Sequence, residues 1–139
     1  MLNIDVHPEA ARFLQKSVGY ALAANPLHAC LFVLYVEKTR NGKTTFCRAI
    51  LHALGDYGST ARPETLAVNR MRTGSGPNSD VARLRGARFV NMPEPGKGLE
   101  LDAALVKSLT GRDPMLARFM HKDFFEFVPQ FVLFLNTNY

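Results

Sequence analysis

The chain has 139 residues, of which 47% are hydrophobic, and a formal net charge of +5 at pH 7. This length buries one hydrophobic core rather than two, so we expect a single domain or part of one. The longest apolar run, residues 29–36, is far shorter than the roughly 20 residues needed to cross a bilayer, and the N-terminus lacks a secretory-signal pattern. The positive charge favours a polyanionic partner. Cys30 and Cys47 have no metal-binding spacing and are expected to be reduced core residues of a cytosolic protein.

Helices and strands are expected to alternate from the N-terminus onward. Pro8 suits the first turn of a helix, and apolar residues recur after it at helical spacing, which predicts an amphipathic helix over residues 8–24. The continuous apolar run 29–36 predicts a buried strand of a parallel sheet. A second helix is expected from Lys43 to Leu54, ending at Gly55.

The second half of the chain continues this alternation. We expect a loop from Arg72 to Ser79, a buried strand over Arg88 to Met92, a short helix over Asp102 to Leu109 capped by Thr110-Gly111, and a third buried strand over Gln130 to Leu135 that ends in Asn136-Thr137-Asn138. The whole pattern predicts a layered α/β fold with a mostly parallel sheet and with its loop sites at one edge.

The most informative motif is Asn41-Gly42-Lys43-Thr44-Thr45, which lies between the first predicted strand and the second predicted helix. A strand, a tight loop and a helix N-terminus aim backbone N–H groups and a partial positive charge at one point, which suits a phosphate. Lys43 would reach the β- and γ-phosphates of ATP, and the Thr44 hydroxyl would hold Mg²⁺. The general pattern has glycine five positions before Gly42, where this chain has Glu37, so a coincidental Gly-Lys-Thr at a strand–helix turn is the alternative.

Two further polar residues follow predicted strands. Phosphoryl transfer needs an acid at the end of a neighbouring strand, and Glu94, just after residues 89–92, is the only acid so placed. Asn138 ends the third predicted strand, where an amide could contact the γ-phosphate or position water. The alternatives are a solvated strand end for Glu94 and an ordinary turn residue for Asn138.

Residues 115–128 show strand-like alternation on both sides of His121-Lys122-Asp123, which predicts a β-hairpin with a charged tip. A projecting tip with His121 and Lys122 could contact a nucleic-acid backbone. A solvated hairpin end without a partner is the alternative.

Taken in this order, the motifs resemble the helicase domain of phage and plasmid primase-helicases, the superfamily-three, AAA+-like group that includes the poxvirus primase-helicase. The segments that carry the resemblance are Phe13–Gln15, Gly19–Leu22, Thr39–Thr45, Leu54–Tyr57, Pro63–Thr65, Ser79–Phe89, Glu94-Pro95, Lys107–Asp113, Ala117-Arg118, Phe125–Pro129 and Asn136–Asn138. Each is weak alone, but together they follow the family order over nearly the whole chain.

The resemblance implies a P-loop NTPase core of three layers over residues 29–139, preceded by a helical segment over residues 1–28 and carrying a DNA-binding β-hairpin insertion. It implies that ATP is bound by Arg40, Asn41, Gly42, Lys43, Thr44 and Thr45, and that Mg²⁺ is held by Thr44 and Glu94. Lys43, Glu94 and Asn138 would be the catalytic residues. Arg118, His121 and Lys122 would grip single-stranded DNA in the channel of a ring.

The family continues beyond the position of Asn138 with further helices and an arginine finger, and a primase half often precedes it. We therefore expect a C-terminally incomplete domain that alone turns ATP over poorly or not at all. Our first hypothesis is an ATP-dependent DNA helicase of a phage or plasmid, a hexameric ring that translocates on single-stranded DNA in the bacterial cytoplasm, with a primase domain or protein as partner. The second is a truncated, inactive remnant that binds DNA or a helicase partner, motivated by Glu37, the missing region and the positive charge.

Overall fold

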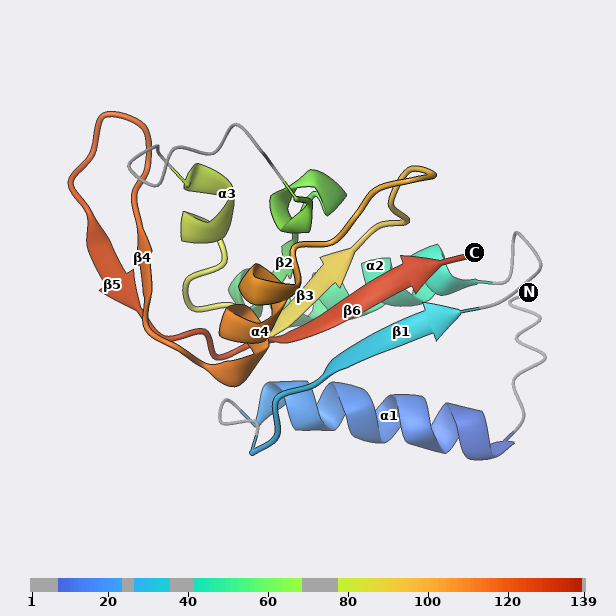
Figure 1. Cartoon of the computed structure of the whole chain (residues 1–139). Helices are drawn as coiled ribbons and strands as arrows, with labels where there is room; N and C mark the ends of the chain where they lie inside the picture. Colours follow the sequence, from blue (N-terminus) through green and yellow to red (C-terminus); the bar gives the residue numbers. More distant parts are fainter. Residues whose placement is uncertain (1–7, 24–26, 36–41, 69–77, 139) are drawn as a thin grey trace.

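The computed structural model describes residues 8–23, 27–35, 42–68 and 78–138 (Figure 1). The elements follow in the order α1 (Pro8–Leu22), β1 (Leu31–Tyr35), α2 (Lys43–Leu54), the 3₁₀ helix η1 (Gly55–Tyr57), β2 (Gly58–Thr60), the 3₁₀ helix η2 (Pro63–Leu66), α3 (Ser79–Ala82), β3 (Phe89–Met92), α4 (Ala103–Gly111), β4 (Met115–Ala117), β5 (Phe125–Phe127) and β6 (Val132–Thr137). None of the helices in these ranges has the length and apolar character that crossing a membrane requires.

The centre of the fold is a four-stranded parallel sheet in the order β1-β6-β3-β2. The last strand in sequence, β6, lies between β1 and β3. All four strands point the same way, so their carboxyl ends form one edge of the sheet (Figure 1). The predicted α/β class with a mostly parallel sheet is confirmed. The carboxyl ends of β3 and β6, and the residues that follow them, are therefore neighbours in space.

Successive strand residues point to opposite faces of the sheet, and helices pack against both faces at β3 and β6, whereas Val33 and Tyr35 of β1 are exposed rather than buried as predicted. On one face Phe89, Val132 and Phe134 pack with Ala21 of α1 and Cys47 of α2. On the other face β3 and β6 contribute Val90, Met92 and Leu133, which pack with residues of α3, α4 and the β4–β5 hairpin: Val81, Ala82, Leu109, Ala117 and Phe127. Near-continuous apolar strands are what a sheet covered on both faces requires.

Several predicted boundaries are confirmed and others are corrected. Helix α2 has the predicted bounds, and Gly55 follows it with φ 53°, a backbone conformation that favours glycine. Helix α4 includes Gly111, and Arg112 takes the left-handed cap position instead. Strand β6 runs to Thr137 rather than Leu135. Ser79, expected in a loop, begins α3.

One strand was missed. β2 has only three residues, Gly58–Thr60, and pairs with β3 at the sheet edge. A segment this short carries no readable alternation, so local pattern does not reveal it. β2 forms because β3 lies beside it in the folded chain as a parallel partner.

A row of phenylalanines ties α1 to the sheet. Phe89 and Phe134 stack with ring centroids 4.3 Å apart, Phe32 stacks on Phe134 at 5.1 Å, and Phe13 meets Phe32 edge-on at 5.9 Å. Phe134 has no solvent exposure. Because its ring touches β1 and β3 at once, it holds the middle of the sheet together.

We predict that Phe134→Ala lowers the free energy of unfolding by about 3–5 kcal/mol, because it removes a fully buried ring and leaves a cavity. Val33→Ala on the exposed side of β1 should change it by no more than about 0.5 kcal/mol. Urea titrations of the two variants measure this. Equal losses would contradict the assignment of Phe134 to the core.

Candidate functional site

The first part of the candidate site is the N-terminus of α2, at the carboxyl edge of the sheet. Gly42 has φ 86°, which glycine adopts without the strain of a side chain, and its carbonyl accepts the first helical hydrogen bond from the Phe46 amide at 2.8 Å. Lys43 and Thr44 therefore occupy the first turn of a helix, where backbone N–H groups have no helical acceptor and the helix dipole favours an anion. Thr44 and Thr45 are exposed there.

Three predicted site residues are joined by hydrogen bonds at this edge. The Lys43 Nζ donates to Asn138 Oδ1 and, at 3.1 Å, to the Thr137 carbonyl. The Asn138 Nδ2 donates to Glu94 Oε2 at 2.7 Å. We call Lys43, Asn138 and Glu94 the outer chain. It connects the start of α2, the end of β6 and the loop after β3, although its members lie far apart in the sequence.

The outer chain has a definite polarity. The Asn138 amide presents its oxygen to an ammonium and its nitrogen to a carboxylate, so one neutral group separates and orients two opposite charges. Charge-assisted hydrogen bonds of this kind are stronger than those between neutral groups. The arrangement therefore holds a cation and an anion in fixed positions beside the N-terminus of α2.

The donor set at this edge fits Mg²⁺ better than a metal that needs a cage of protein ligands. Among the described residues, no group of three or more histidine, cysteine, aspartate or glutamate side chains could hold a metal. Glu94 and Thr44 are exposed oxygen donors. Mg²⁺ is commonly held by one or two carboxylates together with substrate phosphates and water. Arg40, Asn41 and Glu37 lie outside the described residues.

A second set of polar residues lies in the interior of the protein, and the sequence analysis did not identify it as part of the site. Asn136 on β6 and Asn91 on β3 are only 8% and 9% exposed. The Asn136 Nδ2 donates to Asn91 Oδ1 at 2.6 Å and to the Met92 carbonyl at 3.2 Å, while the Cys47 thiol lies 3.8 Å from Asn136 Oδ1. We call Asn91, Asn136 and Cys47 the inner network. The sequence did contain a signal for this network, namely two asparagines in otherwise apolar strands, because buried amides need hydrogen-bond partners.

The inner network also sets the chemistry of its thiol. Burial raises the pKa of Cys47, and the hydrogen bond with Asn136 partly offsets that rise. Cys47 is therefore held as the neutral thiol, the form that donates to an amide oxygen. Both cysteines are free, as predicted, but only Cys47 is a core residue, because Cys30 is half-buried.

We predict that the free energy of unfolding falls as the pH rises above about 8.5, the ordinary thiol pKa. In that range the unfolded chain releases the Cys47 proton while the folded chain keeps it, so fewer protons are bound in the unfolded state and stability decreases with pH. Urea titrations at about pH 7 and about pH 9.5 measure the change. Cys47→Ala should show a smaller decrease than the unmodified chain, and identical decreases would contradict this account.

The predicted hairpin pairs as an antiparallel β-ribbon, with Met115 opposite Phe127 and Ala117 opposite Phe125. Ala117 and Phe127 anchor it to the core. Arg85, just after α3, places its guanidinium 5.1 Å from the Phe125 ring centroid. The ribbon is therefore fixed at its base, and its connecting segment, residues 118–124, is carried outward.

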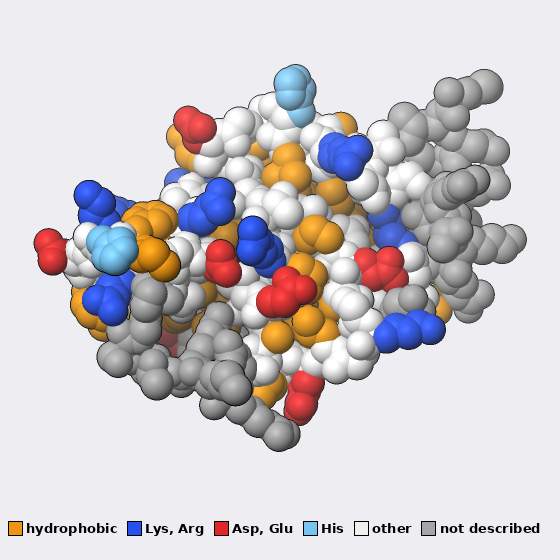
Figure 2. Space-filling model, turned by 90° about the horizontal axis from the view of Figure 1, so that it is seen from above, with side chains coloured by type: hydrophobic (Ala, Val, Ile, Leu, Met, Phe, Trp, Pro, Cys, Tyr) orange, Lys and Arg blue, Asp and Glu red, His pale blue; other side chains and the backbone are white. Residues whose placement is uncertain are grey.

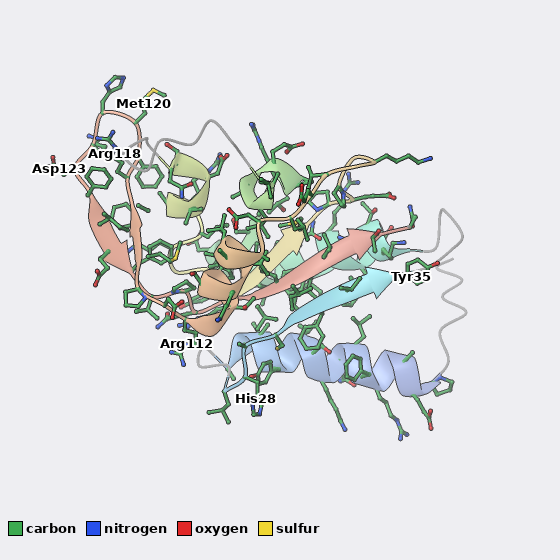
Figure 3. The ribbon with its side chains drawn as sticks, in the orientation of Figure 1. His28, Tyr35, Arg112, Arg118, Met120 and Asp123 are labelled. Atoms are coloured by element: carbon green, nitrogen blue, oxygen red, sulfur yellow. The ribbon has the colours of Figure 1, made fainter. Side chains whose placement is uncertain are left out.

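The hairpin tip, residues 118–124, combines exposed apolar and basic side chains. Phe119, Met120 and Phe124 are 41%, 63% and 47% exposed, and His121 and Lys122 are exposed beside them. His121 has φ 57° at the turn. The Arg118 guanidinium lies 4.5 Å from the Phe124 ring centroid. Figure 3 shows Arg118, Met120 and Asp123 together at the outer end of the hairpin, and Figure 2 shows basic and apolar side chains gathered at that end of the molecule.

The hairpin and the outer chain lie at opposite ends of the sheet. The strands point toward the edge that carries the outer chain, and the hairpin lies beyond their amino ends (Figure 1). The structure thus brings Lys43, Glu94 and Asn138 together and keeps Arg118, His121 and Lys122 away from them.

No family model matches the sequence. The chain is 31% identical over 130 residues to "Putative helicase 022R" of Frog virus 3 (isolate Goorha), covering 91% of the chain, and 30% identical over 107 residues to "Putative helicase L207/L206" of Acanthamoeba polyphaga mimivirus, covering 77%. Its fold is similar to that of the NrS-1 C-terminal region (305–718), with a TM-score of 0.65, 12% identity and 99% of the chain covered. A second structure of that region gives a TM-score of 0.57 at 10% identity over 90% of the chain.

These likenesses define a helicase-like α/β domain. The chain spans only 13% and 11% of the two viral relatives and 32% of the NrS-1 region. Assignment to superfamily three, the truncation and the phage or plasmid source stay predictions.

Proposed function

We propose that this chain is the nucleotide-binding part of an ATP-dependent DNA helicase. The observation that carries the proposal is the outer chain, in which a lysine at a helix N-terminus, a strand-end amide and a carboxylate meet at the carboxyl edge of a parallel sheet. Ligands of open α/β sheets bind at this edge. The likeness to viral helicases supports the same proposal.

Each residue of the edge has a role in this proposal. Lys43, which now donates to the Asn138 and Thr137 oxygens, would donate to γ-phosphate oxygens of ATP instead, so that its ammonium neutralises charge on the phosphates. Thr44 and Glu94 hold Mg²⁺, which when bound supplies charge stabilisation at the transferring phosphoryl group. Asn138, released from Lys43, orients the γ-phosphate or the attacking water.

The proposal includes an oligomer. Phosphoryl transfer in related chemistry gains about 10³ to 10⁵ in rate from an arginine donated by a neighbour. We propose that the whole protein assembles into a ring that translocates on single-stranded DNA, with a primase domain or protein as partner. Within this chain we propose two parts, an N-terminal helical segment over residues 1–28 and a nucleotide-binding core over residues 29–139.

We predict that Lys43→Ala reduces Mg²⁺-dependent ATP binding at least about tenfold, because it removes the cation that faces the phosphates. Arg48→Ala is the matched control, since Arg48 is an exposed cation on the same helix. Isothermal titration calorimetry of the 139-residue chain measures both. Equal affinities of the unmodified chain and Lys43→Ala would end the nucleotide-binding proposal.

We propose that the hairpin tip binds single-stranded DNA. Exposed aromatic and apolar side chains beside basic ones form the combination on which bases stack while cations follow the phosphates. Phe119 and Phe124 supply the rings, and Lys122 and His121 supply the polar contacts. Arg118 acts partly through Phe124, whose ring it covers.

We predict that Lys122→Ala weakens binding to an oligothymidylate and lowers the slope of log affinity against log salt by about 0.7, the value for one phosphate contact on a single strand. Lys107→Ala removes an equal charge from α4 and serves as control. Fluorescence anisotropy over a range of salt concentrations measures both slopes. A slope that is unchanged in Lys122→Ala, or changed equally in Lys107→Ala, would contradict a specific tip contact.

The separation of the two ends favours a second candidate, an inactive remnant that binds DNA or a helicase partner. Because the hairpin is anchored to the core independently of the outer chain, DNA binding does not require a working nucleotide site. This candidate predicts DNA binding that is indifferent to Lys43→Ala together with no ATP binding by the unmodified chain.

A further inference from the structure

We infer that the inner network of Asn91, Asn136 and Cys47 positions the outer chain, and so sets where Mg²⁺ is held. This inference rests on the proposed function for its consequence in nucleotide binding. Its structural part, that the inner network orients Asn138 and Glu94, concerns the free protein and stands or falls separately.

The outer chain and the inner network have the same arrangement, one at the exposed end of the sheet and the other in its interior. Lys43 and Cys47 are four residues apart, so they lie on one side of α2. Asn136 and Asn138 are two residues apart at the end of β6, so they lie on one face of the sheet. Lys43 bonds Asn138 and Cys47 contacts Asn136. Each asparagine also reaches across to the β3 side, Asn138 to Glu94 and Asn136 to Asn91.

The inner network extends the connection between β6 and β3 past their last paired residues. The pairing of these strands ends at Met92 and Leu135. Beyond that point the Asn136 side chain holds the Met92 carbonyl at 3.2 Å. Met92 is the last residue of β3, and only Pro93 separates it from Glu94. The amide of Asn136 therefore fixes the start of the segment that carries the carboxylate.

The buried Asn136 amide can hold its neighbours in a fixed orientation through hydrogen bonds, which an apolar side chain cannot do. Asn136 uses both its donor and its acceptor on partners from two elements, so rotation of the amide would leave buried polar atoms without bonds. A leucine of similar size fills the volume but imposes no orientation on β3 or α2. Partners that orient metal ligands typically change metal affinity or activity by about 10- to 100-fold when replaced.

The test separates positioning from stability. Asn136→Leu leaves the Asn91 oxygen buried without its partner, so it should unfold at lower urea. The double variant Asn91→Leu with Asn136→Leu removes both polar groups and should recover most of that loss. Asn78→Ala, a remote asparagine at the start of α3, is the control.

In the folded double variant we expect two changes. Exchange of the Asn138 side-chain amide protons, followed by NMR in the free protein, should accelerate several-fold, because the amide no longer has fixed partners. The gain in ATP affinity on adding Mg²⁺ should fall about tenfold, while ATP binding in EDTA stays unchanged. A merely structural role would not produce this split between the metal-dependent and metal-free affinities.

A double variant with unaltered Asn138 exchange and an unaltered Mg²⁺ gain would overturn the inference. Should the unmodified chain bind no ATP, the proposed function fails, and the Asn138 exchange rates alone decide whether the inner network positions the outer chain. If Asn78→Ala changes the exchange as much as the double variant does, the inference is also wrong.

Discussion

The insertion of β6 between β1 and β3 is the constraint on which the rest of the structure depends. The chain completes one edge pair, β2 with β3, and only later returns to fill the gap beside β1. Both faces of β6 are then covered, which is why Val132, Leu133 and Phe134 are almost fully buried. Because β6 has neighbours on both sides, residues at its carboxyl end lie between the carboxyl ends of β1 and β3.

That placement explains why asparagine suits the end of β6. An amide can accept from one neighbour and donate to the other, whereas a carboxylate only accepts and an ammonium only donates. Asn138 does this at the exposed edge between Lys43 and Glu94, and Asn136 does it in the interior. Repetition of one side-chain chemistry along a strand gives a polar seam through an otherwise apolar layer.

The apolar strands, α2 and the glycine at the start of α2 can be predicted from the sequence, because they depend on local pattern and on backbone conformation. It also predicts Lys43, Glu94 and Asn138 as candidates, but their mutual hydrogen bonds depend on strand order, which periodicity does not contain. For the same reason the sequence does not single out Asn136, because its burial can be understood only when Asn91 is known to lie opposite. The three-residue β2 is set by its neighbour rather than by its own residues.

The direct covalent path from the hairpin to the sheet edge has a mechanical consequence. After Phe127 the chain needs only a short linker before it enters β6, which runs straight to the asparagine beside Lys43 (Figure 1). Along this path β6 is hydrogen-bonded on both sides, to β1 and to β3. In the proposed function, phosphate binding beside Asn138 and DNA binding at the hairpin tip would therefore act on opposite ends of one continuous stretch of backbone.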